Sequence, residues 1–523
     1  MGSGLVKTIV VLILLSALAF VVGSLSSDGL KSAMAPVGLL VLGVALMCLG
    51  RYSWVLVFIL PSAVSALDIS FLQELPVAYV ASSCLLVYWL MMYIMGYVKV
   101  TWHKGTVIDI ATLIFSLYFA YTWVMHPVTV RALVNEITDA GYATIGGKEY
   151  IWLVFASLTY IFISIIPMDM ERTGKLLRAC FWISLFFMLI STAKGVLFGT
   201  AEQAEAASTG ESSRFSGFAG LGFALFTYIV CKYDIIRILC SPWKLIVIAA
   251  STFGVAVSGF RNLILQLAIL GLFSQYLKRK LLLTLLPCSV LYIALMLLSH
   301  GGMLNQLPYG VQRVMTAFPG VEVSSRQVVL AAKGSLDWRY QMWEWAMDPS
   351  SGYIKDYTWG DGFGQSAYWY RLYRINLNRG NVRFGDNEIF AKQGQWHNGP
   401  ITAIHRTGYV GLCLVSMWAI VAAFYTVRVC FFVRNYRYSE YFLYYLMSML
   451  LVVFRFYLAA GTFIDIFSGY FYLALVKMMF SLGIKSGHIK PLFNKQNYVP
   501  LMVKAIEDVQ HGPTRSQDQA AGT

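Results

Sequence analysis

The stretch "QGQWHNGPITAIHRTGYVG", from Gln393 to Gly411, places a tryptophan, two histidines, an asparagine and an arginine directly before a long apolar run. That run, about 407–427, is long enough to cross a bilayer core, which takes about 17 to 25 apolar residues of helix. Polar and ionisable groups are costly inside the membrane. The stretch therefore predicts a membrane helix whose first turns carry a polar site at the edge of the bilayer.

The whole chain has the composition of an integral membrane protein. It has 523 residues, of which 58% are hydrophobic and 13% charged, whereas soluble domains carry about 25% charged residues. Its eight cysteines show neither a disulfide framework nor a CxxC metal pair. The first apolar run lacks a clear small-residue cleavage site and is interpreted as an uncleaved first helix.

Apolar windows of spanning length recur along the chain and predict an all-α polytopic membrane protein. We expect about fourteen transmembrane helices, within a range of about 12 to 14. The windows are 5–24, 34–49, 53–67, 77–97, 107–125, 150–167, 179–198, 217–232, 244–258, 262–276, 281–299, 407–427, 440–458 and 465–483.

The charges between these windows predict the orientation. If the N-terminus is cytoplasmic, the inner loops are rich in lysine and arginine, and the opposite short loops are mostly acidic, as the positive-inside rule requires. An even number of spans puts both termini in the cytoplasm. The formal net charge of +14 is then mostly a consequence of topology, and no nucleic-acid partner is needed to explain it. The inner loops include Lys99, Arg172, Lys175, Arg178, Lys232, Arg237, Lys278, Arg279, Lys280, Arg428, Arg434 and Arg437.

One segment is too long and too polar to be a connector. We divide the chain into an N-terminal bundle of about eleven spans (1–299), a large outer loop (300–406), about three C-terminal spans (407–484), and a cytoplasmic, disordered tail (485–523). In the loop, "SLDWRYQMWEWAMDP" predicts a short helix with Ser335 as its N-cap and Pro349 as its stop. The glycine-punctuated turn "YTWGDGFG" follows.

Several polar residues are expected on the outer face, near the ends of spans. Arginine presents a fixed fork of donors that fits phosphate oxygens, so converging arginines would bind a diphosphate. A neutral imidazole is the side chain best suited to take a proton from a hydroxyl near neutral pH. The candidates are Arg214, Arg261 and Arg339, with Trp343 one turn after Arg339, and His397 with its neighbour Asn398.

Each candidate also has a plain structural interpretation. An arginine at the end of a span serves either as an anchor at the lipid headgroups or as a ligand group, and Arg339 would equally suit a solvated helix face. Asn398 would orient either the imidazole or a sugar hydroxyl. His405 and Arg406 are expected to be interfacial anchors, and Arg455 to extend outward from its span. Carboxylates for a metal are scarce, with "DNE" at 386–388 as the only close pair in the loop, so no metal or other cofactor is expected.

Taken in order, these elements resemble the bacterial O-antigen ligase and polysaccharide polymerase superfamily. The resemblance rests on "RFSG" at the start of a span, "SGFRN" between two spans, "WRYQMWEWAM" and "WGDGFG" in the large loop, and "HNGPITAIHRTGYVG" leading into the next span. It covers roughly Arg214 to the span that ends near Val427.

The resemblance implies a metal-independent, inverting glycosyltransferase of the bacterial inner membrane. Its donor would be a glycan on a polyprenyl (undecaprenyl) diphosphate, and its acceptor a hydroxyl of another glycan, a lipid A-core or a protein on the periplasmic face. His397 would deprotonate or position the acceptor hydroxyl. Arg214, Arg261 and Arg339 would bind the diphosphate, supported by Asn398 and Trp343.

The sequence leaves the exact reaction open. The first hypothesis is an O-antigen ligase of lipopolysaccharide biosynthesis, because the chain has one dominant outer loop. The alternative is a repeat-unit polymerase that makes O-antigen or exopolysaccharide. A lipid-linked sugar flippase is a further alternative from another class. The long loop and the absence of an obvious internal repeat disfavour transporter folds built from duplicated halves.

Overall fold

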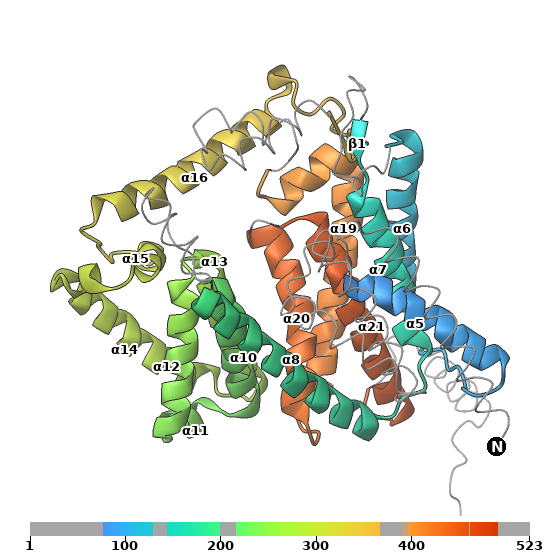
Figure 1. Cartoon of the computed structure of the whole chain (residues 1–523), viewed down its shortest axis with the longest axis horizontal. Coiled ribbons are helices and arrows are strands. Elements are labelled where there is room, and N and C mark those ends of the chain that lie inside the picture. The colour runs from blue at the N-terminus through green and yellow to red at the C-terminus, as the bar shows by residue number, and fades with distance from the viewer. Residues whose placement is uncertain are drawn as a thin grey trace, which may run out of the picture.

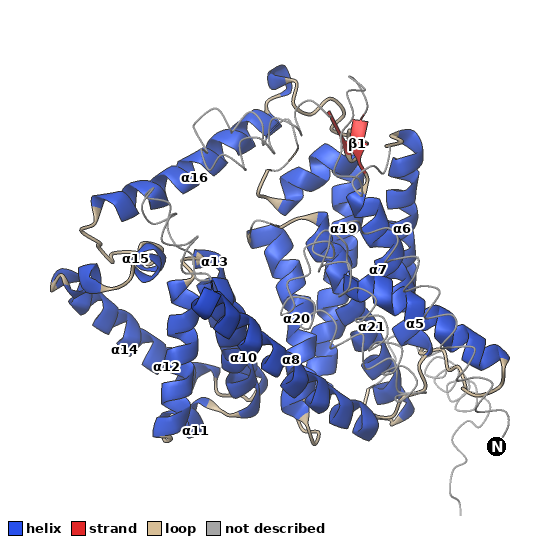
Figure 2. Ribbon diagram, in the orientation of Figure 1, coloured by secondary structure: helices blue, strands red, loops and turns tan. Residues whose placement is uncertain are grey.

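The computed structural model describes residues 77–128, 144–198, 216–366, 391, 394, 396–459 and 461–489. Within these ranges the regular structure is helical, apart from the short strands β1 (Thr144–Gly146) and β2 (Gly364–Ser366), which pair antiparallel (Figure 2). The predicted windows 5–24, 34–49 and 53–67, the tail after residue 489 and Arg214 lie outside the described residues.

The helices follow the predicted order. Every apolar window from 77–97 onward coincides with a helix, so the prediction of helices is confirmed there. The elements are α5 (Val77–Ile94), α6 (Thr106–Met125), α7 (Lys148–Ile165), α8 (Met170–Phe198), α10 (Ser216–Lys232), α11 (Ile235–Leu239), α12 (Pro242–Val257), α13 (Arg261–Leu277), α14 (Leu281–His300), η2 (Met303–Gln306), α15 (Tyr309–Met315), α16 (Arg326–Met347), η3 (Pro349–Ser351), α19 (Gly399–Val433), α20 (Ser439–Leu458) and α21 (Phe463–Lys485).

Among the described residues, six helices are long and apolar enough to cross a membrane: α6, the 170–190 part of α8, α14, α19, α20 and α21. Shorter apolar helices lie within α5, α7, α10 and α12. Large apolar side chains on the outer surfaces, such as Leu282 and Leu286 of α14, are well exposed. Such surfaces would be unfavourable in water but are suited to lipid. The chain is therefore a helical membrane protein, and the total of about fourteen spans stays a prediction.

The described helices form two groups, with one long helix across the top (Figure 1). The first contains α5, α6, α7 and α19 to α21, and the second α10 to α15, while α20 packs against both α10 and α21. The core of the first group is aromatic, with Trp418, Phe467 and Tyr470 fully buried. Helix α16 extends from the second group toward the ribbon of β1 and β2, above α19.

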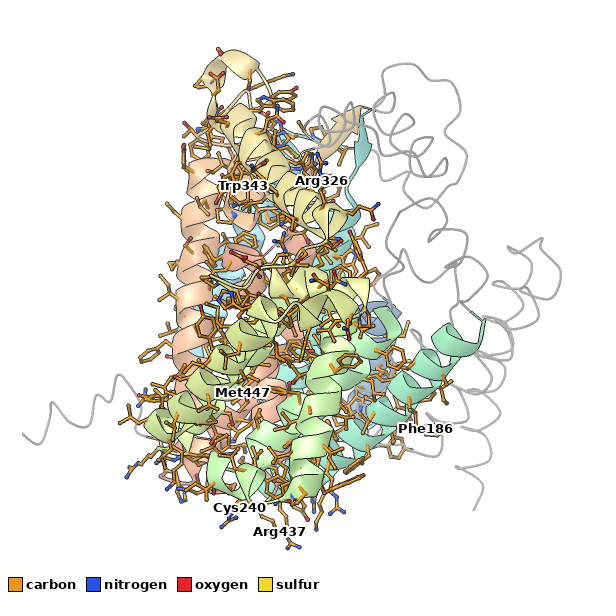
Figure 3. All side chains as sticks on the ribbon, turned by 90° about the vertical axis from the view of Figure 1, so that its left-hand side faces the viewer. Phe186, Cys240, Arg326, Trp343, Arg437 and Met447 are labelled. Atoms are coloured by element: carbon orange, nitrogen blue, oxygen red, sulfur yellow. The ribbon has the colours of Figure 1, made fainter. Side chains whose placement is uncertain are left out.

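The two ends of the bundle are formed by different segments of the chain. Arg326 and Trp343 of α16 lie at one end, and Cys240 and Arg437 at the other (Figure 3). The α11 turn and the α19–α20 connection, which the sequence predicts to be cytoplasmic, share that second end. The two connections that are predicted to share a compartment therefore lie at the same end of the bundle. The assignment of the ends to compartments stays a prediction.

Two helix starts differ from the sequence prediction. Helix α16 begins at Arg326, after Ser325, and not at Ser335, because Gln327, Leu330 and the neighbouring alanines favour helix strongly enough to continue through Gly334. Its end agrees with the predicted stop at Pro349. Helix α19 begins at Gly399 rather than near Thr407, because the side chain of Asn398 caps it.

Candidate functional site

The glycine turn of the large loop is fastened to a break in α19. Gly408 has φ 68° and ψ −178° inside this helix, a conformation that is essentially restricted to glycine. The freed backbone groups bond to the turn: the amide of Tyr409 donates to the carbonyl of Tyr357 (2.8 Å), and the amide of Gly362 donates to the carbonyl of Arg406 (3.0 Å). The motifs "TWGDGFG" and "HRTG" therefore form one unit.

His405 and Arg406 stabilise this unit from within. Both are buried, so the interpretation as headgroup anchors is wrong. The guanidinium of Arg406 donates through Nη1 to the carbonyls of Gly362 and Gly364, at 3.2 Å each. His405 Nε2 lies 3.6 Å from the carboxylate of Asp361. Arg455, expected to extend outward, instead donates from Nε to the side-chain oxygen of Gln266 (3.1 Å).

A tryptophan joins this unit to the predicted base. Trp396 is fully buried, and its indole nitrogen donates to Nδ1 of His405 (3.1 Å). With Nδ1 accepting, the neutral ring of His405 carries its proton on Nε2, facing Asp361. The carbonyl of Trp396 in turn accepts from the indole nitrogen of Trp343 on α16 (2.9 Å). The segment before His397 is thus held on both sides.

His397 itself lies in a strained, partly buried position. Its φ is 47°, a left-handed conformation that is uncommon for residues other than glycine. Its ring centroid lies 5.1 Å from that of Trp338. Burial, together with the nearby charge of Arg339, lowers the pKa of His397 to about 4. The imidazole is therefore neutral at physiological pH in the free protein, and a bound anion near it would raise its basicity.

Asn398 serves the backbone in this structure. Its Oδ1 accepts a hydrogen bond from the amide of Ile401 (3.0 Å), which is the N-cap interaction of α19. The cap fixes the direction in which α19 leaves the loop, and so fixes the residue that precedes it. Asn398 therefore positions His397 through the backbone.

One face of α16 brings the other candidates together. Arg261 Nη2 donates to the carbonyl of Ala332, at 3.4 Å. Arg339 and Trp343 follow Ala332 by two and three turns on the same face, so Arg339 lies about 10 Å along the axis from the Arg261 contact. The acidic residues of α16 in this region, Asp337 and Glu344, are exposed and lie on the opposite face by helical geometry.

The predicted residues thus have different outcomes. Arg261, Arg339, Trp343, His397 and Asn398 are all brought to α16 or to the α19 start that it contacts. Arg214 lies outside the described residues. Trp396, Trp338 and Asp361 lie in motifs that the sequence singled out, but they were given no role there. The aspartate in "WGDGFG" could have been assigned one, because a carboxylate among glycines commonly bonds neighbouring backbone amides.

Metal-binding groups and relatives give little further information. Within the described ranges, no three or more histidine, cysteine or acidic side chains are grouped so as to hold a metal ion, and the "DNE" segment lies outside them. No protein-family model matches the chain, and no curated protein matches it. The class that fold and site define is a helical membrane protein with arginine and histidine side chains gathered along one loop helix.

Proposed function

We propose that the protein is a membrane glycosyltransferase that moves a glycan from a polyprenyl diphosphate carrier to an acceptor hydroxyl on the periplasmic face. The observation that carries the proposal is the position of His397, a neutral imidazole in a partly dehydrated site, near the guanidinium of Arg339. A base beside a fixed cation suits a reaction in which a hydroxyl loses its proton and a diphosphate departs.

The proposed reaction is a direct displacement at the anomeric carbon of the donor. The acceptor hydroxyl gives its proton to a ring nitrogen of His397, while its oxygen attacks the anomeric carbon from the side opposite the carrier. The bond between that carbon and the diphosphate oxygen breaks, the electron pair stays on the diphosphate, and the configuration is inverted. Arg339 and Arg261 neutralise the leaving group, and Arg214 is proposed to join them.

The location follows from the same assignment. The face of α16 would lie at the outer surface of the bacterial inner membrane, with both chain termini in the cytoplasm. A carrier diphosphate lies at the depth of the lipid headgroups while its polyprenyl chain stays in the bilayer. This depth matches a base placed just before a membrane helix, as His397 is placed before α19.

The proposal is tested by measuring glycan transfer by the purified protein in detergent, with an undecaprenyl-diphosphate oligosaccharide as donor. Wild type, His397→Ala and His300→Ala are compared, with EDTA present; His300 is an exposed histidine at the end of α14 and provides the matched control. We expect product with wild type and His300→Ala, and a loss of at least about a hundredfold with His397→Ala.

The sizes of the products distinguish a ligase from a polymerase. A single size shift of a lipid A-core acceptor would indicate ligase activity, and a ladder of repeat units would indicate a polymerase. Full activity of His397→Ala would contradict the assigned base, and dependence on a divalent metal would contradict metal-independent transfer. Movement of the carrier across liposomes without any product would favour a flippase.

A further inference from the structure

A cavity of about 390 Å³ lies away from the His397 site, at the end of the bundle opposite α16. It is enclosed by the end of α10, the α13–α14 connection and the α19–α20 connection. Four cationic side chains line it, together with small polar and apolar groups. The lining residues are Cys231, Lys232, Leu277, Lys278, Arg279, Arg434, Asn435, Ser439 and Leu443.

Two of the cations are held in place by hydrogen bonds to backbone carbonyls near the C-terminal ends of helices. Lys278 donates from Nζ to the carbonyls of Val230 (2.5 Å) and Tyr233 (2.6 Å). Arg434 donates from Nη1 to the carbonyl of Leu277, at 3.1 Å. Cations at the C-terminal ends of helices interact favourably with the helix dipole. These bonds hold the cavity walls in place and keep both positive charges beside it.

The carboxylates nearest the cavity lie outside its lining. Asp234 and Glu440 both act on Lys278, but neither lines the cavity. Asp234 accepts from the amide of Arg237 (2.9 Å) and lies 3.5 Å from its guanidinium. Four cationic residues and no carboxylate therefore line the same space.

Arg279 provides a second observation. Its φ is 58°, in the turn where the amide of Lys280 bonds to the carbonyl of Gln275 (2.8 Å) and its own amide to Tyr276 (2.9 Å). Helix ends of this kind usually place glycine at the left-handed position, because other residues are strained there. The side chain of Arg279 is exposed and makes no hydrogen bond or ion pair with the described residues. A strained, exposed guanidinium at a cationic cavity suggests a role beyond folding.

The surroundings indicate where a ligand would come from. Leu282, which follows the loop, is 82% exposed, and Trp243, at the start of α12, is 72% exposed. Apolar and tryptophan side chains exposed at a helix end are typical of the membrane interface. We propose that this cavity binds a phosphate group, that of an anionic lipid headgroup in the leaflet at this end of the protein. The site is separate from glycan transfer and does not depend on it.

The experiment uses the purified, delipidated full-length protein in a neutral detergent. Binding of phosphatidylglycerol and of phosphatidylcholine is measured by native mass spectrometry, and inorganic phosphate is added as a competitor. Wild type is compared with Arg279→Gly, which relieves the backbone strain while removing the charge. Lys280→Gln is the matched control, because it removes a neighbouring charge that does not line the cavity.

We expect phosphatidylglycerol to bind more tightly than phosphatidylcholine, and Arg279→Gly to weaken its binding about fivefold, in line with the contribution of one cation near a lipid surface. The melting temperature of lipid-free Arg279→Gly should equal or exceed that of wild type, and Lys280→Gln should bind normally. Displacement of the lipid by millimolar phosphate would assign the site to free phosphate. Equal binding of the two lipids, or unchanged binding by Arg279→Gly, would overturn the proposal.

Discussion

The environment of His397 leads to a quantitative prediction about pH. If the neutral imidazole is the base, kcat/KM falls as pH drops through the pKa of His397 in the free enzyme. With a pKa of about 4, about 97% of the side chain is neutral at pH 5.5, against about 9% for an ordinary histidine of pKa about 6.5. Wild-type kcat/KM should therefore be almost unchanged between pH 7.5 and pH 5.5.

The substitution Trp338→Ala tests whether burial is what lowers the pKa of His397. Burial is the larger cause of the lowered pKa, and the Trp338 ring, 5.1 Å from the imidazole, contributes to that burial. Its removal admits water, which stabilises the charged form and raises the pKa of His397 toward its ordinary value. At pH 5.5, kcat/KM of Trp338→Ala should then fall by up to about tenfold relative to its own value at pH 7.5.

The assay is initial-rate transfer from a polyprenyl diphosphate donor between pH 4.5 and pH 8. The diphosphate of this donor is esterified at both ends and keeps only strongly acidic groups, so its charge is constant over the range and the acidic limb reports on the protein. Each enzyme is compared with itself, which removes any general loss of activity. Trp243→Ala, at an exposed tryptophan in the first turn of α12, is the matched control and should keep the wild-type profile.

Donor binding adds a second part to the test. A bound diphosphate brings negative charge near His397, which favours the imidazolium. The acidic limb of kcat, which reports on the enzyme–substrate complex, should therefore lie at higher pH than that of kcat/KM. A wild-type limb of kcat/KM near pH 6.5, or a limb that Trp338→Ala leaves in place, would refute the reasoning.

The remaining predictions concern the scaffold. Gly408→Ala should lower the free energy of unfolding in detergent by at least about 2 kcal/mol, because a Cβ there meets the carbonyl of Thr358; an unchanged melting temperature would contradict the role of the break. Asp109→Asn should cost about 3 kcal/mol by removing the negative charge that balances the buried ammonium of Lys477, 2.5 Å away, and adding Lys477→Met should restore most of the melting temperature. In α16, Gly334→Pro should abolish transfer, whereas Gly334→Ala, whose Cβ meets no neighbour, should keep it and raise stability by about 0.5 to 1 kcal/mol; equal activity of the two variants would show that a continuous α16 is not needed.

The helices were predictable because the bilayer imposes a simple requirement on sequence. A spanning helix needs a continuous apolar run, and such runs mark α14 and α20 clearly. Helix starts were less predictable. At Ser335 a capping residue follows a glycine, which looks like a boundary, although the residues before it favour helix. A capping signal depends on one or two residues, whereas the length of a helix depends on the helix propensity of all the residues around that point.

The candidate site was predictable in its residue types but not in its connections. The spacing of Arg261, Arg339 and His397 in the sequence does not indicate that α16, which carries Arg339, also meets the other two residues. The buried pairing of Trp396 with His405 was also missed, because it depends on a chain reversal at the start of α19. Contacts of this kind arise from tertiary packing, on which hydrophobic periodicity carries no information.

The arrangement of the site explains why α16 is a single long helix. Arg261 belongs to the second helix group and His397 to the first, so neither group contains the proposed diphosphate site and the proposed base together. Helix α16 contacts both: Ala332 accepts from Arg261, and three turns later Trp343 donates to the segment that holds His397. Because a helix is stiff over this distance, it fixes the separation of the base from Arg261. The break at Gly408 then allows the start of α19 to meet α16 while the rest of that helix continues through the bundle.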